Sequence, residues 1–419
     1  MRKVIITLVL ITSVLMMAGA GGRKENEVTP DLDKTEITYF TFSAAPDHLD
    51  HLDEMIAVFE EENKDITIKV ETAGWDDYFN KLQVNIAGDL APDVFELNYE
   101  NFITYAAKGA LYDMDTLAST DSSFSSNLYY PKSYGSFNYK NVQYGLPETF
   151  STVVLFYNMD LFDKAGVEYP KESWTWNDAI KAAKKIRDED KDIWGLFSDV
   201  QFWEFYKKIA QNGGSFFDEA GNVVIDSPKN IEALQTMLDI EKKYNIMPTD
   251  AQMGGVSDGD LFLSGKLGML VSGIWMFGAF GEADFKWNIE VEPGMSTKAT
   301  HFFANALVIS SSTKKAEAAW KWVKFFTSSA ESAKMRIRTG WELPTISDQS
   351  AVASYLKAGN PENRQAVFNS LKYSIVPPVI ERQNELQDGI NLLLQKAELG
   401  TLSASEALSQ AAELLESLK

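Results

Sequence analysis

Aromatic and polar side chains that follow predicted strands are the residues of this chain best suited to chemistry. Trp75 follows a predicted strand at 66–70, and Asn98 and Glu100 follow another at 93–97. Aromatic rings stack on the apolar C–H faces of pyranose rings, while carboxylates and amides accept protons from sugar hydroxyls. Because the chain holds ten Trp, sixteen Tyr and twenty-five Phe, this combination favours holding a sugar over cutting one.

Two further polar candidates follow the first predicted strand, at 37–42. Ser43 and Asp47 could both hydrogen-bond a sugar hydroxyl, although Asp47 could instead cap the helix that begins there. A buried carboxylate that binds a hydroxyl gains selectivity, because an analogue without that hydroxyl leaves the carboxylate unpaired.

Motifs for catalysis or metal binding are sparse. The sequence contains neither G-x-S-x-G nor H-E-x-x-H. His48 and His51 stand three apart among aspartates and could form a metal-binding face, but a solvated helix face is the simpler interpretation. The segment at 257–260 resembles part of a calcium loop without its full spacing, so we predict a turn there. We expect no cofactor and no metal. Paired carboxylates for glycoside hydrolysis stay open, because their separation in space decides.

Composition limits the partners and the compartment. The net charge of −21 argues against nucleic acid and anionic membrane surfaces as partners. A hydrophobic content of 45% in 419 residues predicts a large core and roughly two or three domains. Because the chain has no Cys, no disulfide can support the fold.

The N-terminus has the pattern of a secretory signal. A basic pair, Arg2 and Lys3, precedes an apolar run at 4–17 and the small residues Ala18-Gly19-Ala20. We predict a signal peptide at 1–20 and a flexible tether at 21–36, with an uncleaved anchor helix as the alternative. The apolar run is shorter than the roughly 20 residues that span a bilayer.

Strand and helix signals alternate along the chain. The strands at 37–42, 66–70 and 93–97 are separated by helices beginning near Asp47 and Tyr78. This βαβαβ order is typical of a parallel sheet covered by helices, whose ligands bind beyond the carboxyl ends of the strands.

The second half repeats this alternation. A strand is predicted at 153–157, and Thr175 and Asp178 have the spacing of a capping box. We interpret the neighbouring Trp174 and Trp176 as structural. Trp320 and Trp322, in a helix predicted at 316–327, are interpreted in the same way, and a second capping box stands at 403–406.

Four groups of motifs together resemble the extracellular solute-binding proteins of ABC sugar importers, the maltose-binding-protein-like family. They cover nearly the whole chain beyond the tether. In order they are Ala91-Pro92-Asp93-Val94; then 144–147, 155–162 and 174–176; then 265–269 and 273–275; and finally Gly340-Trp341-Glu342-Leu343-Pro344.

This resemblance implies an α/β, two-lobed periplasmic-binding-protein fold with discontinuous lobes, a hinge and a central ligand cleft. It places the N-terminal lobe at 37–148 plus 303–346 and the C-terminal lobe at 149–300 plus 347–419. The chain would cross between lobes near 147–152, 300–305 and Ser347. Implied partners are a carbohydrate ligand and a membrane permease, and we expect a monomer that is not an enzyme.

The resemblance also adds site candidates. Trp275, after the turn at Gly273, would be a stacking platform. Trp203 could stack on a second sugar ring or pack its own helix. Polar candidates are Glu148 at the hinge and Asn305 at the return crossover, and Trp341 and Glu342 lie in a loop that often contacts ligand in relatives.

One departure concerns the lipid anchor. Many relatives carry a lipidated Cys at the cleavage point, where this sequence has Ala20. We therefore expect export to the periplasm or the outer face of the cytoplasmic membrane without that anchor; the alternative is that Ala20 replaces a native lipidated Cys. Two alternatives stay open: a secreted glycan-degrading enzyme, and a binder of a phosphorylated polyol or a metal. The phosphate ligands would be Arg336, Arg338 and Arg382, although nothing in the sequence brings the three together.

Overall fold

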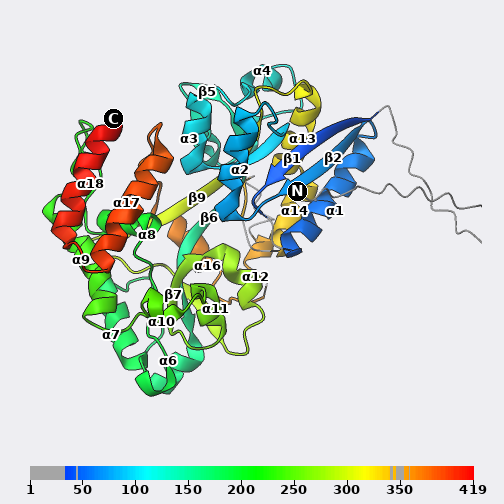
Figure 1. The fold of residues 1–419 in the computed structure, drawn as a ribbon. Helices are drawn as coiled ribbons and strands as arrows, with labels where there is room; N and C mark the ends of the chain where they lie inside the picture. The colour runs from blue at the N-terminus through cyan, green and yellow to red at the C-terminus, as the bar shows by residue number, and fades with distance from the viewer. Residues whose placement is uncertain (1–33, 44–45, 340–342, 346–352, 358) are drawn as a thin grey trace, which may run out of the picture.

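The computed structural model describes residues 34–43, 46–339, 343–345, 353–357 and 359–419 (Figure 1). The predicted signal peptide, most of the predicted tether, Trp341, Glu342 and the crossover near Ser347 lie outside the described residues.

The first part of the chain forms the predicted βαβαβ unit. It consists of β1 (Thr35–Thr41), α1 (Pro46–Glu62), β2 (Ile66–Thr72), α2 (Trp75–Ala87) and β3 (Val94–Asn98). Strand β1 lies between β2 and β3 and is parallel to both, as the sequence predicts. The carboxyl ends of these strands therefore lie along one edge, where Ser43 and Trp75 follow β1 and β2 and Asn98 is the last residue of β3.

Two long strands run between the halves of the molecule. Figure 1 shows β6 (Gly145–Asn158) and β9 (Thr300–Ile309) crossing from the blue and cyan part to the green part. Residues 145–152 of β6 pair with β9, and residues 153–158 pair with β7 (Met269–Gly273) and β8 (Trp287–Glu290). The sheet order is β10-β6-β9-β3-β1-β2, with β10 at Leu343–Pro344.

Strand β6 is longer than the strand predicted at 153–157, so that prediction was too short. All fourteen residues of β6 are buried. The first half of β6 lacks the alternation of apolar and polar residues that predicts a strand. Pro147 interrupts it, and the polar residues between Glu148 and Thr152 are buried with their apolar neighbours. The pairing with β9 shifts register between Pro147 and Thr149, which leaves Glu148 as the extra residue of a β-bulge.

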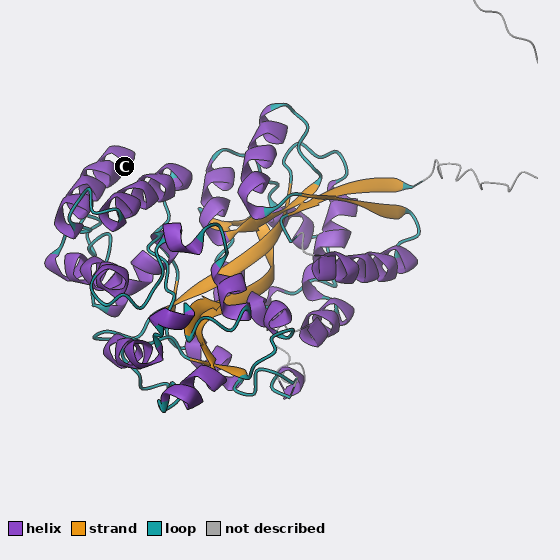
Figure 2. Cartoon of the chain, turned by 60° about the horizontal axis from the view of Figure 1, so that its bottom comes forward, coloured by secondary structure: helices purple, strands orange, loops and turns teal. Residues whose placement is uncertain are grey.

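Helices cover the sheet on its two sides (Figure 2). The remaining helices and strands are α3 (Tyr99–Ala107), α4 (Met114–Ala118), α5 (Pro131–Gly135), β4 (Asn138–Tyr139), β5 (Val142–Gln143), α6 (Met159–Ala165), α7 (Trp176–Ile186), α8 (Phe202–Gln211), α9 (Pro228–Lys242), α10 (Asp250–Met253), α11 (Asp258–Leu263), α12 (Phe277–Phe280), α13 (Ala316–Ser328), α14 (Ala330–Thr339), α16 (Gln365–Leu371), β11 (Ser374–Ile375), α17 (Gln383–Glu398) and α18 (Ala404–Leu418). Three short 3₁₀ turns lie at 126–128, 189–191 and 274–276.

Local capping chemistry fixes several helix starts. The two predicted capping boxes are confirmed at the starts of α7 and α18. The turn predicted at 257–260 was wrong, because Ser257 caps α11: its hydroxyl accepts from the Asp260 N–H and donates to the Asp260 carboxylate. The Ser-x-x-Asp spacing is itself a helix-start signal.

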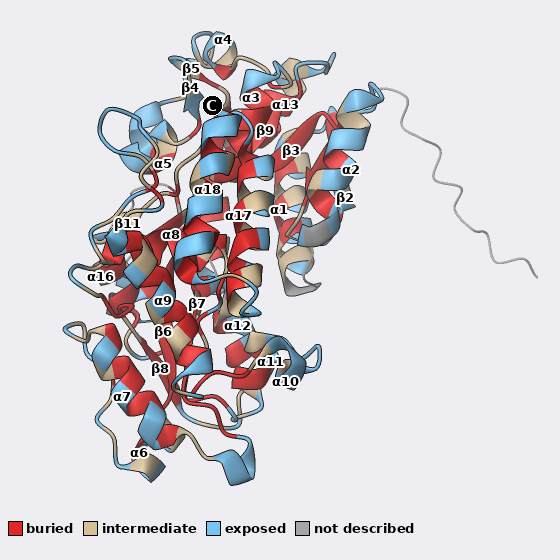
Figure 3. Cartoon of the chain, turned by 60° about the vertical axis from the view of Figure 1, so that its left-hand side comes forward, coloured by how far each residue is buried: buried red, intermediate tan, exposed pale blue. Residues whose placement is uncertain are grey.

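Figure 3 shows which parts of the chain are buried. The buried hydrophobic residues form three clusters. One lies among α7, α8, α9, α17 and α18, one lies between α1 and α13, and the third spans both halves around β6 and β9. The structural interpretation of three tryptophans is confirmed, since Trp176, Trp320 and Trp322 are all buried. Among the described helices, none is both long enough and apolar enough to cross a bilayer.

Candidate ligand-binding cavity

A cavity of about 930 Å³ lies where the carboxyl ends of β1 and β3 face the second half of the chain. Its volume is at the upper end of the range typical for small-molecule sites. Residues of β6 and β9 belong to its wall, including Ser151, Val153 and Phe303. The cavity is therefore built from both halves and from the strands that join them.

Six of the predicted site residues line this cavity. They come from both halves of the chain and from β9: Ser43, Trp75, Asn98, Trp203, Trp275 and Asn305. Two of the tryptophans keep unusually large open surfaces for their type, with 46% of Trp75 and 37% of Trp275 exposed. Exposed aromatic rings inside a concave surface are typical of a ligand site.

Trp275 is held by its neighbours on β7 and β9. It follows Gly273, the last residue of β7, and its ring packs edge-on against Phe303 at a centroid distance of 5.1 Å and an angle of 81°. A Cβ on Gly273 would lie 1.9 Å from a carbon of the Trp275 ring. The absence of a side chain at Gly273 is thus what gives the ring its place.

Trp75 belongs to an aromatic group in the first half of the chain. Its ring packs edge-on against Phe42, at 5.0 Å and 83°, and against Phe79, at 5.2 Å and 86°. These contacts support one edge of the indole while much of the side chain remains open. Trp203 combines the two roles considered from the sequence, because it lines the cavity and also packs on Phe303 at 5.7 Å.

A buried carboxylate of α8 reaches the cavity from the second half. Glu204 lines it and forms an ion pair of 2.7 Å with Lys207, which lies 2.9 Å from Glu292. Burial raises the pKa of Glu204 against the opposing effect of Lys207. Burial would lower the pKa of Lys207, but the two carboxylates raise it, so Lys207 stays charged and fixes Glu204 in place.

Three aspartates extend this acidic side of the cavity: Asp199, Asp250 and Asp258. The Asp199 side chain is exposed to the cavity. Its pKa is nevertheless raised to about 6, first because the surrounding protein partly desolvates the carboxylate and second because Glu204 carries a nearby negative charge. Sequence reasoning missed these residues. The segment before Asp199 joins the sheet only through isolated bridges from Trp194 and Phe197, which leave no periodic signal.

Glu100 and Glu148 do not line the large cavity. Glu100 lies behind Asn98, fully buried, and the Asn98 Nδ2 donates to its Oε2 at 2.5 Å. Burial raises the pKa of Glu100 to about 8. Asp47 lies in the first turn of α1, after Pro46, and the structure describes its backbone alone.

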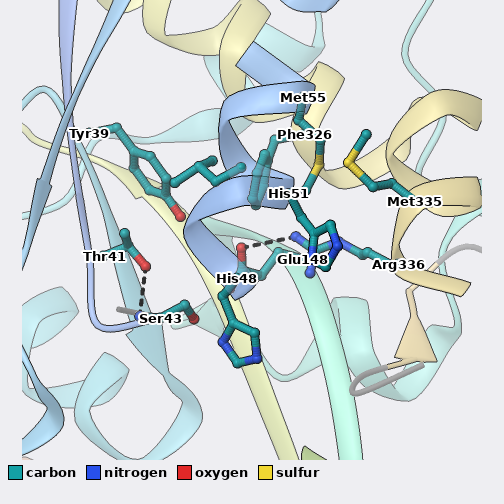
Figure 4. A pocket seen from close by; sticks show the side chains of 11 residues that line it. Tyr39, Thr41, Ser43, His48, His51, Met55, Glu148, Phe326, Met335 and Arg336 are labelled. Carbon is teal, nitrogen blue, oxygen red and sulfur yellow. Dashed lines mark hydrogen bonds and ion pairs between the residues drawn. The ribbon is translucent and has the colours of Figure 1, made fainter. Parts of the chain in front are cut away.

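Glu148 faces a second, much smaller pocket of about 30 Å³, which Figure 4 shows from close by. Its carboxylate forms an ion pair of 3.4 Å with Arg336, and both side chains are buried. Ser43 and His48 line both pockets, so the small pocket adjoins the large one. Its size admits groups no larger than water.

The groups needed for phosphate or metal binding are not gathered here. Arg336 pairs with Glu148, while Arg338 and Arg382 form surface ion pairs with Glu54 and Glu385. Among the described lining residues of the large cavity there is no Lys or Arg. His48 and His51 belong to no described group of three or more residues that could hold a metal ion.

Comparison with known proteins gives a consistent result. Residues 45–333 match the family model described as bacterial extracellular solute-binding protein. The arabinooligosaccharide-binding protein of Bacillus subtilis is 25% identical over 350 residues, covering 80% of this chain and 78% of the relative. The galactooligosaccharide-binding protein of the same organism is 25% identical over 370 residues, covering 85% and 84%.

A solved structure shows higher similarity. An ABC substrate-binding protein from Listeria monocytogenes, in complex with cycloalternan, is 44% identical with a TM-score of 0.89. The match covers 92% of this chain and 99% of that one. This agreement confirms the predicted two-lobed α/β fold.

Proposed function

This chain belongs to the bacterial extracellular solute-binding proteins, and on that premise we propose that it is the carbohydrate-binding component of an ABC importer. The ligand would be an oligosaccharide held in the 930 Å³ cavity between the lobes. The observation that carries the proposal is the pair of partly exposed tryptophans, Trp75 and Trp275, which line one cavity from opposite halves of the chain.

The chemistry of the lining favours an uncharged ligand. Aromatic rings offer stacking faces, and Asn98, Glu204 and Asn305 offer acceptors or donors for hydroxyls. Four carboxylates and no described Lys or Arg in the lining would repel a phosphate or a uronate. The similar proteins that bind cycloalternan, arabinooligosaccharide and galactooligosaccharide support an oligosaccharide over a polyol phosphate or a metal.

The mechanism we propose is lobe closure. The N-terminal lobe would comprise 37–148 and 303–346, and the C-terminal lobe 149–300 and 347–419. The change of strand partners after Thr152 of β6 supports a hinge at 147–152 and at 300–305. A sugar that contacts both lobes would shift the population toward a closed form, which the permease would recognise.

The remaining parts of the proposal concern location and assembly. We propose that residues 1–20 direct export, that the protein acts as a monomer outside the cytoplasmic membrane, and that Ala20 leaves it without a lipid anchor. The membership of an extracellular binding family supports export and a binding role without bond cleavage.

A thermal-shift screen of the chain from residue 21 onward would test the function. The panel would contain cycloalternan, arabinotriose, galactotriose, a glucuronate-containing trisaccharide, a polyol phosphate and divalent metal salts. A ligand that binds the native state raises Tm, and we expect a rise with at least one neutral oligosaccharide, recovered unchanged by chromatography. Cleaved sugar would favour the enzyme alternative, and a shift only with the phosphate or a metal would overturn the sugar assignment.

A further inference from the structure

A continuous chain of buried polar side chains stands behind the cavity wall. It begins at Asn98, which lines the cavity and is 1% exposed. The Asn98 Oδ1 accepts from Asn101 at 2.8 Å, and its Nδ2 donates to the Glu100 Oε2. Both ends of the Asn98 amide are therefore fixed by neighbours on α3.

The chain continues from Glu100 into the other half of the molecule. The Glu100 Oε1 lies 3.1 Å from the His301 Nε2, a close approach without an aligned hydrogen bond, and neither atom has a hydrogen-bond partner elsewhere among the described residues. The His301 Nδ1 shares a short hydrogen bond with the Tyr206 hydroxyl, which lies 3.4 Å from the carbonyl oxygen of Ile375. Thus α3, β9, α8 and β11 are joined in one line.

The far end of this line supports a second part of the cavity wall. Trp203 lies on α8 three residues before Tyr206, and its ring packs edge-on against His301 at 5.3 Å and 77°. Phe303, the support of Trp275, lies over the His301 ring at a centroid distance of 3.4 Å. His301 therefore contacts two residues that line the cavity, Trp203 and Phe303.

We propose that Glu100, His301 and Tyr206 form a positioning relay that holds Asn98 of one lobe and Trp203 of the other against the same sugar. The proposal rests on the oligosaccharide-binding function proposed above. The three residues are positioning residues, because none of them lines the cavity.

One distribution of protons satisfies the whole relay. If Glu100 is protonated, Asn98 donates to Glu100, Glu100 to the His301 Nε2, the His301 Nδ1–H to Tyr206, and Tyr206 to Ile375. Ionisation of Glu100 would require the opposite tautomer of His301, would reverse the bond to Tyr206 and would leave Ile375 without its donor. It would also leave a carboxylate charge in a fully buried site.

The surroundings favour the neutral relay at pH 7. Burial raises the pKa of Glu100 to about 8, and burial together with Lys207 holds the pKa of His301 well below its usual range. The other titratable groups facing the relay are Tyr99 beside Glu100, and Glu204 and Glu292 beside Tyr206, the latter two paired with Lys207. Within the relay, the charge change between pH 7 and 9 therefore belongs to Glu100.

The first test measures affinity for cycloalternan, with arabinotriose as the second probe, at pH 7 and pH 9. If only the neutral relay is competent, a pKa of about 8 predicts an affinity about tenfold weaker at pH 9. Glu100→Gln, whose amide can donate to His301 and accept from Asn98, should bind like the wild type at pH 7 and lose this pH dependence. Glu100→Leu should weaken binding at least tenfold at both pH values.

Tyr129→Phe serves as the matched control, because Tyr129 is equally buried and hydrogen-bonded to Thr327 far from the relay. Its affinity and pH profile should equal those of the wild type, whereas Tyr206→Phe should weaken binding. Equal losses in Glu100→Gln and Glu100→Leu would overturn the proposal, as would a wild-type affinity that is flat between pH 7 and 9.

A second measurement needs no sugar and separates this proposal from the function on which it rests. The chain has three histidines, so nitrogen-15 NMR of the rings, with His301→Gln for assignment, can read the His301 tautomer directly. We expect a neutral Nδ1–H ring at pH 7 that changes to Nε2–H above pH 8, and no change in Glu100→Gln. An Nε2–H ring at pH 7 would overturn the relay even if sugar binds, and failure of every sugar to bind would overturn the function alone.

Discussion

The ring of Trp275 occupies the space that a side chain on Gly273 would need. A Cβ built on Gly273 would stand 1.9 Å from a ring carbon of Trp275, well inside contact distance. Gly273 and Trp275 are two residues apart in sequence. The ring can lie over the end of β7 only because Gly273 has no side chain. This relationship makes the position of the ring testable without removing the ring.

Replacing Gly273 with Ala should displace the Trp275 ring and weaken oligosaccharide binding about tenfold, because a misplaced platform loses its stacking contact. Isothermal titration would measure the affinity, and tryptophan fluorescence would report the moved ring. Gly135→Ala is the control, since a Cβ at Gly135 meets nothing within 4 Å. Unchanged affinity in Gly273→Ala would show that the ring position is irrelevant to binding.

Replacing Trp275 with Ala should weaken binding at least tenfold while changing Tm little. With 37% of its surface exposed, Trp275 should cost the fold less buried area than a core tryptophan would, whereas a central aromatic contact contributes about 2 kcal/mol or more to binding. Trp174→Ala provides the contrast, because Trp174 packs on Phe162 and lies outside the lining of the cavity. It should lower Tm and leave the affinity intact; the reverse pattern would assign Trp275 to the core.

The acidic side of the cavity should discriminate against anionic sugars more strongly as pH rises. The pKa of Asp199 is about 6 because the cavity wall encloses it beside Glu204. Ionisation between pH 5 and 7 adds a negative charge to the wall, so any residual affinity for a glucuronate-containing trisaccharide should fall across that interval. Asp199→Asn should flatten the profile, and a neutral trisaccharide should show no such fall in either protein.

Lys208→Met should stabilise the protein at pH 6 by about 1–3 kcal/mol, as happens when a buried charge gives way to an apolar group. Lys208 is buried with its ammonium over the Trp176 ring, and burial lowers its pKa to about 7. Between pH 7 and 10.5 the unfolded chain binds more protons at this residue, so the wild type should gain stability as pH rises through that window.

Urea unfolding at pH 6 and pH 9 would measure this difference. We expect the advantage of Lys208→Met to shrink at pH 9. Lys207→Met is the informative neighbour: it leaves Glu204 and Glu292 without their cation and should destabilise by about 3–5 kcal/mol. Equal effects of the two substitutions would contradict the assigned charge states.

Local signals in the sequence predicted much of this architecture. Hydrophobic periodicity located β1, α1, β2 and β3, and the capping boxes located α7 and α18, because these signals depend only on residues near one another in the chain. Strand-end reasoning identified the cavity residues Ser43, Trp75 and Asn98, because the carboxyl ends of parallel strands meet at one edge. The family resemblance added Trp203, Trp275 and Asn305.

What the sequence did not reveal depends on contacts between distant segments. The length of β6 follows from its pairing with β9, about 150 residues later, and Pro147 and the bulge at Glu148 interrupt the alternating pattern that would predict the strand. Asp199 becomes part of the cavity wall only through packing against β7. The sequence suggested Glu100 as a ligand contact. Its burial behind Asn98 could not be predicted, because it depends on how the strands and helices assemble.

The long pairing of β6 with β9 has an evolutionary consequence. A one-residue insertion in either strand would turn every following side chain to the opposite face, so the crossover should resist changes in length. The described tryptophans that line the cavity lie in the first turns of α2 and α8 and in a 3₁₀ turn, where replacement leaves the strand register intact. Descendants of this chain can therefore change their sugar preference while keeping the proposed lobe closure.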